Sequence, residues 1–109
     1  PSLATVYKAH ERIMTALNLV IESIQEGDLE KARQVITIEK EFDSFELSSR
    51  QNIIRRMNNA ETSIDSGLLL LDLLSNLERV SDHLKNIAHV VIDLDGQTRF
   101  TELSPVPNP

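Results

Sequence analysis

The stretch LLDLLSNLERVSDHLKNIAHVVIDL, residues 70–94, decides the fold. Its apolar residues recur at alternating steps of three and four, which is the spacing of one helix face packed against neighbouring helices. The positions are Leu70, Leu73, Leu77, Val80, Leu84, Ile87, Val91 and Leu94. We therefore predict a long helix over residues 60–94 that buries this row of side chains in a bundle.

Two further helices are predicted before this one. Residues 2–26 repeat the apolar spacing of three and four. Gly27 followed by Asp28 is typical of a helix end and of the N-cap of a second helix, here residues 28–57. Because this connection is tight, the first two helices must run antiparallel. The predicted fold class is all-α, an antiparallel three-helix bundle.

The two ends of the chain differ from this pattern. After Gly96 the apolar spacing stops, and Pro105, Pro107 and Pro109 prevent a helix. We predict a bundle in residues 1–95 and an irregular tail or linker in residues 96–109. The chain starts at Pro1 without a methionine, so we expect a piece of a longer protein.

Composition excludes several classes of function. With 17 acidic and 11 basic side chains the net charge is -6, which argues against a nucleic-acid partner and against direct binding to anionic lipid. There is no cysteine, so disulfides and thiolate metal sites are impossible. The chain has no Gly-rich phosphate loop and no recognisable nucleophile with its base. We therefore predict no catalytic residues and no enzyme activity.

Two acidic pairs share one spacing. Glu39 and Asp43 lie one helical turn apart in the second helix, and Glu78 and Asp82 lie one turn apart in the third. If the two helices face each other at these depths, four carboxylates converge into a site for a hard cation, namely magnesium, calcium, manganese or iron. His89, seven residues after Asp82, could add a nitrogen ligand. Glu39 lies on a core-facing position, where an unpaired carboxylate is costly.

The alternative interpretation needs no ligand. Acidic pairs at this spacing are common on solvated helix faces, where Lys40 or Lys85 would neutralise them. Among the histidines, His10 shares the apolar stripe of the first helix and is expected to be buried or half-buried. His83 is expected to face solvent.

Two stretches resemble the PhoU-like domains. GLLLLDLLSNLERVSDHLKNIAHVV, residues 67–91, is similar to their third-helix signature, and GDLEKARQVITIEKEFD, residues 27–43, is similar to their second-helix entry. With the first helix, the resemblance covers residues 3–94. It implies a regulator of phosphate uptake built of three-helix repeats, whose E/D-x-x-x-D motifs bind metal clusters, often iron. The positions that match those motifs are Glu39, Asp43, Glu78 and Asp82.

A single repeat of this kind is similar to the cytoplasmic C-terminal domain of bacterial sodium/phosphate cotransporters. The resemblance then implies a regulatory, non-enzymatic domain at the inner face of the membrane, joined to the transporter portion of the same chain. A different class of function stays open, a structural dimerisation bundle without a ligand. In either case we expect a homodimer, because residues 68–74 are apolar on nearly every side of their helix.

Overall fold

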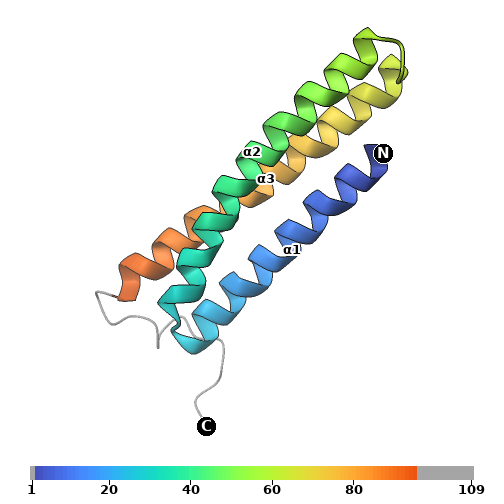
Figure 1. Ribbon diagram of the computed structural model, residues 1–109. Coiled ribbons are helices and arrows are strands. Elements are labelled where there is room, and N and C mark those ends of the chain that lie inside the picture. Colours follow the sequence, from blue (N-terminus) through green and yellow to red (C-terminus); the bar gives the residue numbers. More distant parts are fainter. Residues whose placement is uncertain (1, 96–109) are drawn as a thin grey trace.

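The computed structural model describes residues 2–95, so the predicted tail at residues 96–109 lies outside the described residues. Three helices follow one another, α1 (Ser2–Glu26), α2 (Leu29–Asn58) and α3 (Ile64–Asp95), and residues 2–95 contain no strand. Figure 1 shows α1 and α3 running in one direction and α2 in the other. The all-α three-helix bundle predicted from the sequence is confirmed.

The first connection forms as its residues predict. Gly27 has a positive φ of 65°, and the Asp28 carboxylate accepts hydrogen bonds from the backbone N–H groups of Glu30 (3.0 Å) and Lys31 (3.3 Å). The Lys31 ammonium binds Glu22 and Glu26 at the end of α1, each at 2.9 Å, and these hydrogen bonds raise the pKa of Lys31. The end of α1 is thus tied to the first turn of α2.

The second connection is longer than predicted, since α3 begins at residue 64 and not at residue 60. Ala60 adopts a left-handed conformation (φ 57°), and the N–H groups of Glu61 and Thr62 both reach back to the Arg56 carbonyl. These bonds close the end of α2. A new helix then needs its own cap, which Ser63 supplies by accepting the Ser66 N–H at 3.1 Å.

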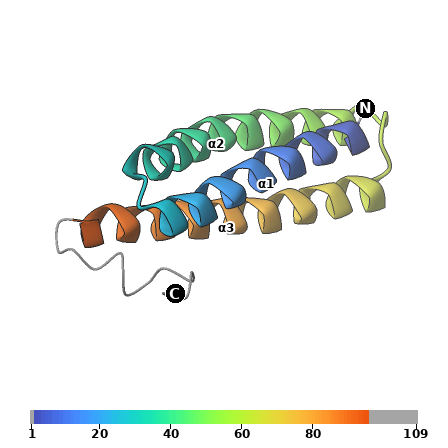
Figure 2. The same ribbon diagram turned by 90° about the horizontal axis from the view of Figure 1, so that it is seen from below.

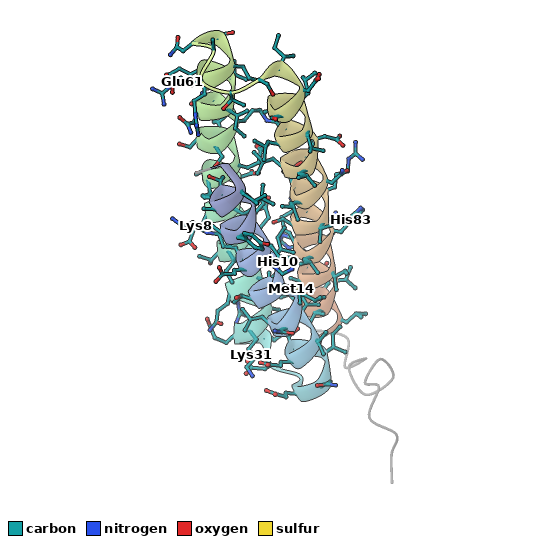
Figure 3. All side chains as sticks on the ribbon, turned by 90° about the vertical axis from the view of Figure 1, so that its right-hand side faces the viewer. Lys8, His10, Met14, Lys31, Glu61 and His83 are labelled. Atoms are coloured by element: carbon teal, nitrogen blue, oxygen red, sulfur yellow. The ribbon has the colours of Figure 1, made fainter. Side chains whose placement is uncertain are left out.

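The core runs along the axis of the bundle, and each helix contacts the other two. Figure 2 shows α1 lying over the groove between α2 and α3. The largest enclosed side chains include Val35, Phe42, Leu74 and Val91. At the end that holds the second connection, α2 and α3 project beyond the start of α1 (Figures 1 and 3).

Four predicted burials are wrong, those of Leu73, Val80 and Ile87 in the predicted row of α3 and that of His10 in α1. Val80 and Ile87, predicted to lie in the seam, are 43% and 42% exposed, and His10 is also exposed. A helix with two neighbours buries only one arc of its surface, and the two lines of a row that alternates steps of three and four lie about 40° to 60° apart around the helix, so one line falls at the edge of that arc. Every second position of the predicted row in α3 therefore turns outward. The apolar belt at residues 68–74 divides in the same way, with Leu70 and Leu74 buried and Leu68, Leu69 and Leu73 exposed.

Candidate functional site

Glu39 is the buried carboxylate of the bundle. It is only 8% exposed and lies in the middle of α2, one turn from Val35 and from Phe42, which are enclosed in the core. The core-facing position predicted for Glu39 is therefore confirmed. A carboxylate at such a position loses much of its hydration, which disfavours its ionised form.

The charges that act on the Glu39 carboxylate come from both acidic pairs. Burial is the main cause that raises the pKa of Glu39, and the negative charges of Asp43, Asp82 and Glu78 raise it further. Lys85 acts in the opposite direction. Because Asp43 belongs to α2 while Glu78, Asp82 and Lys85 belong to α3, the two helices face each other at the depth that the sequence analysis required. We call these five residues the Glu39 cluster.

Glu39 lacks a bonded partner. Within residues 2–95 no hydrogen bond and no ion pair reaches its carboxylate. In the same part of the chain, every fully enclosed side-chain nitrogen or oxygen has a hydrogen-bond partner, so the Glu39 oxygens must keep some contact with solvent. A small ion could therefore reach this carboxylate from outside the bundle.

Lys85 supplies the positive charge of the cluster. Its ammonium lies 2.8 Å from the Asp82 carboxylate. This contact lowers the pKa of Asp82, and Asp82 together with the charge of Glu39 raises the pKa of Lys85. In the sequence, Lys85 is signalled only by its position three residues after Asp82 and seven after Glu78, which places it on the same face of the helix. Of the two lysines proposed as partners of the acidic pairs, Lys85 is the one that binds Asp82.

The charges of Asp43, Glu78 and Asp82 act on Glu39, but the predicted metal ligands are not arranged as a coordination shell. Among residues 2–95, no group of three or more histidine or acidic side chains is spaced to hold a metal ion. His89 is exposed on α3, seven residues beyond Asp82. The chemistry of the donors still fits a hard cation, because all four carboxylates offer oxygen and Glu39 has no other partner. The set Glu39, Asp43, Glu78, Asp82 and His89 stays a prediction.

The other polar residues in the middle of α2 have a structural role. The Arg50 guanidinium donates to the Glu46 carboxylate (Nε to Oε2, 2.8 Å) and to the Ser75 hydroxyl of α3 (2.9 Å). This link joins α2 to α3 nearer the second connection than the Glu39 cluster. The polar residues in the middle of α2 therefore form two features. One is the link from Arg50 to Ser75 of α3, and the other is the Glu39 cluster, whose buried carboxylate has no hydrogen-bond partner.

The family of the chain follows from a comparison with known proteins. The family model of the PhoU domain matches residues 6–91, a range that includes nearly all of the three helices and the whole Glu39 cluster. No curated protein and no solved structure matches the chain at a significant level. In the part of the chain that the structure describes, no helix is long and apolar enough to cross a membrane. The family is regulatory, non-enzymatic and linked to phosphate, and this chain belongs to it as a PhoU domain.

Proposed function

We propose that this chain is a regulatory domain of phosphate transport, in which the Glu39 cluster binds a divalent or ferric cation. Membership of the PhoU domain family supports the link to phosphate regulation. We further propose that the domain is attached to the membrane portion of a sodium/phosphate cotransporter and works at the cytoplasmic face. In this account the cation state of the cluster is the signal that the domain transmits.

The observation that supports a cation most strongly is the state of Glu39. Glu39 is 8% exposed as a residue and has a raised pKa, and its carboxylate feels the charges of three other carboxylates without a hydrogen bond of its own. This arrangement costs folding free energy unless a positive charge compensates it. A bound cation would remove the mutual repulsion and would also supply the missing partner of Glu39.

Cation binding would require Lys85 to leave the cluster. Its ammonium is bound to Asp82, one of the predicted ligands. Four carboxylate oxygens favour magnesium, calcium, manganese or iron over a thiolate-preferring metal. Lys85 would then compete with the cation for Asp82 as a tethered competitor. The distribution of charge on this face of the domain would differ between the cation-free and the cation-bound state.

A second candidate function is a purely structural bundle without a ligand. The 2.8 Å contact between Lys85 and Asp82 favours it, because this contact already neutralises part of the negative charge. In this alternative Glu39 is a buried acidic residue, and the bundle folds in spite of its desolvation cost without any ligand. The two candidates differ in their response to metal, so a single experiment separates them.

Thermal unfolding of the purified chain in Mn²⁺, Mg²⁺, Ca²⁺ or chelator is that experiment. A specific cation should raise the free energy of unfolding by about 2.7 kcal/mol at a hundredfold excess over its Kd. The double variant Glu78→Gln, Asp82→Asn should lose this response. The matched control is Glu22→Gln, Glu26→Gln, which removes two carboxylates at the same spacing near Lys31 and should keep the response.

The ligand-free candidate predicts a different result. The parent would then show no shift with any cation, and the double variant would melt at the same temperature as the parent or higher. The transporter assignment has its own test in the sequence encoded before Pro1. Several apolar segments of about 20 residues there would support it, and a chain without them would contradict it.

A further inference from the structure

A polar pocket lies between the start of α1 and the second half of α2, and we call it the Arg55 pocket. It has a volume of about 640 Å³ and is lined by one aromatic ring, three hydroxyls, two carboxamides and one guanidinium. The polar groups belong to Thr5, Ser48, Ser49, Gln51, Asn52 and Arg55. The chain carries 17 acidic residues, yet none of them lines this pocket. The Arg55 pocket therefore offers many hydrogen-bond donors and a single charge, which is positive.

The surroundings of the pocket are also positive, although the chain as a whole is acidic. Residues 2–10 and 47–60 contain four lysines and arginines and no aspartate or glutamate. These two segments lie side by side because α1 and α2 run in opposite directions (Figure 1). A concave surface lined by one sign of charge attracts small ions of the opposite sign. The net charge of -6 therefore does not prevent a small anion from binding at this end of the bundle.

Arg55 is the cation of the lining. Its guanidinium donates a hydrogen bond to the side-chain oxygen of Asn52, which holds both groups at the pocket wall. The neighbouring Arg50 and Arg56 bind acidic residues, but within residues 2–95 Arg55 forms no ion pair. A guanidinium carries five N–H donors. Most donors of Arg55 are therefore available to a ligand.

Two further cations border the other end of the pocket. The Arg12 guanidinium lies 4.7 Å from the centre of the Phe45 ring, and this ring is the aromatic part of the lining. Stacking on a ring occupies the flat face of a guanidinium and leaves its in-plane N–H groups able to donate. Lys8 lies one helical turn from both Thr5 and Arg12, so it shares their side of α1. Figure 3 shows Lys8 on the side of α1 turned away from α3.

The cations are spread along the pocket. Phe45 and Arg55 are ten residues apart on α2, a rise of about 15 Å, and the uncharged donors of the lining lie between them. We propose that the Arg55 pocket binds a chain of linked phosphate groups, either inorganic or carried by a nucleotide. Such a chain presents acceptor oxygens along its whole length. A polycarboxylate of the same length would place methylene groups against hydroxyls and carboxamides, which favours it less.

Isothermal titration calorimetry of the 109-residue chain with tripolyphosphate, ATP and inorganic phosphate tests the ligand class. The titrations are made in chelator, because linked phosphates themselves bind metal ions, so the result does not depend on the proposed cation site. A single phosphate reaches only one end of the pocket, so the linked phosphates should bind at least about tenfold more tightly. Tighter binding of ATP than of tripolyphosphate would assign the pocket to a nucleotide, and equal binding to the inorganic chain. Inorganic phosphate that binds as tightly as tripolyphosphate would overturn the proposal, as would no binding of either linked phosphate at about 1 mM.

Charge removal tests the location. Arg55→Gln should raise the Kd for tripolyphosphate by about tenfold or more. Arg55 is exposed and bonds only to Asn52 among residues 2–95, so this variant should keep the helical content of the parent in circular dichroism. Arg79→Gln is the matched control, since it removes the same charge from an exposed position on α3 and should change the Kd by less than about twofold. An equal loss in the two variants would mean that tripolyphosphate is held by general attraction and would overturn the assignment to this pocket.

Discussion

Helix α3 presents two faces of opposite character. Toward α2 it contributes Glu78, Asp82 and Lys85 to a cluster around the buried Glu39. On another face, next to α1, it exposes the apolar side chains of Leu73, Val80 and Ile87. The first face surrounds a charged residue that is buried, and the second exposes apolar residues to solvent. Such departures from the usual distribution are what we expect of binding surfaces.

The two faces therefore carry two different energetic costs, a buried charge and an exposed apolar surface. An isolated bundle would be more stable without the charge of Glu39. It would be more soluble with charged residues in place of Leu73, Val80 and Ile87. A bound cation would remove the first cost, and a partner on the exposed apolar residues would remove the second. If so, a change on one face should leave the binding function of the other face intact, unless it damages the core that both share.

The largest expected effect comes from that shared core. Phe42 is 1% exposed, lies one turn from Glu39 and contacts Phe45, whose ring holds the Arg12 guanidinium of α1 at 4.7 Å. Phe42→Ala should lower the free energy of unfolding by about 3 to 5 kcal/mol in urea denaturation. It should weaken cation binding and dimerisation together. Leu47→Ala, at an exposed position, is the control, and an equally small loss in both variants would contradict the described core.

Lys85 gives a sharper test, because it belongs to one face only. Lys85→Gln removes the tethered competitor from Asp82, so the affinity of the cluster for Mn²⁺ should rise by about tenfold in isothermal titration calorimetry. The Kd of the homodimer expected from the sequence should not change. Lys40→Gln, on the exposed side of α2, should affect neither. Weaker Mn²⁺ binding in Lys85→Gln would mean that Lys85 organises the cluster and does not compete for it.

Glu39→Gln should have opposite effects with and without metal. In chelator the variant removes a buried charge that three carboxylates repel, so it should be more stable than the parent by about 1 kcal/mol at pH 7. In Mn²⁺ it should lose the stabilisation that the parent gains. Paired urea titrations measure both. A variant that is less stable than the parent in chelator would show that the ionised Glu39 has a favourable partner.

The smallest expected effect is a dependence on pH. Since burial raises the pKa of Glu39 in the folded state, the folded chain binds this proton more tightly than the unfolded chain. The stability of the parent relative to Glu39→Gln should therefore rise as pH falls through the raised pKa toward the ordinary value of 4.5, and it should level off below that. A constant difference between the two proteins from pH 7 to pH 4 would contradict the raised pKa.

The sequence predicted the features that depend on local chemistry. The three helices follow from apolar spacing, and the first connection follows from Gly27 and Asp28, whose conformation and capping are those expected of these residue types. The buried position of Glu39 was also predictable, because it occupies a core-facing position in the pattern of α2. Each of these inferences needs only the residues of one helix or one turn.

Features that depend on how far two helices cover a third were not predictable. The row in α3 gave no sign that Val80 and Ile87 face outward, since spacing sets the direction of a side chain and not the depth of cover above it. His10 was misplaced for the same reason. The contact of Lys85 with Asp82 depends on a choice between several acidic partners, and that choice needs the three-dimensional arrangement.

Anomalous diffraction from crystals grown with Mn²⁺ tests the central claim most directly. The account predicts one strong peak between α2 and α3 at the depth of Glu39, bound by carboxylates of both acidic pairs, with the Lys85 ammonium moved away from Asp82. A map without a peak among these carboxylates, in which Lys85 still binds Asp82 at saturating Mn²⁺, would contradict it.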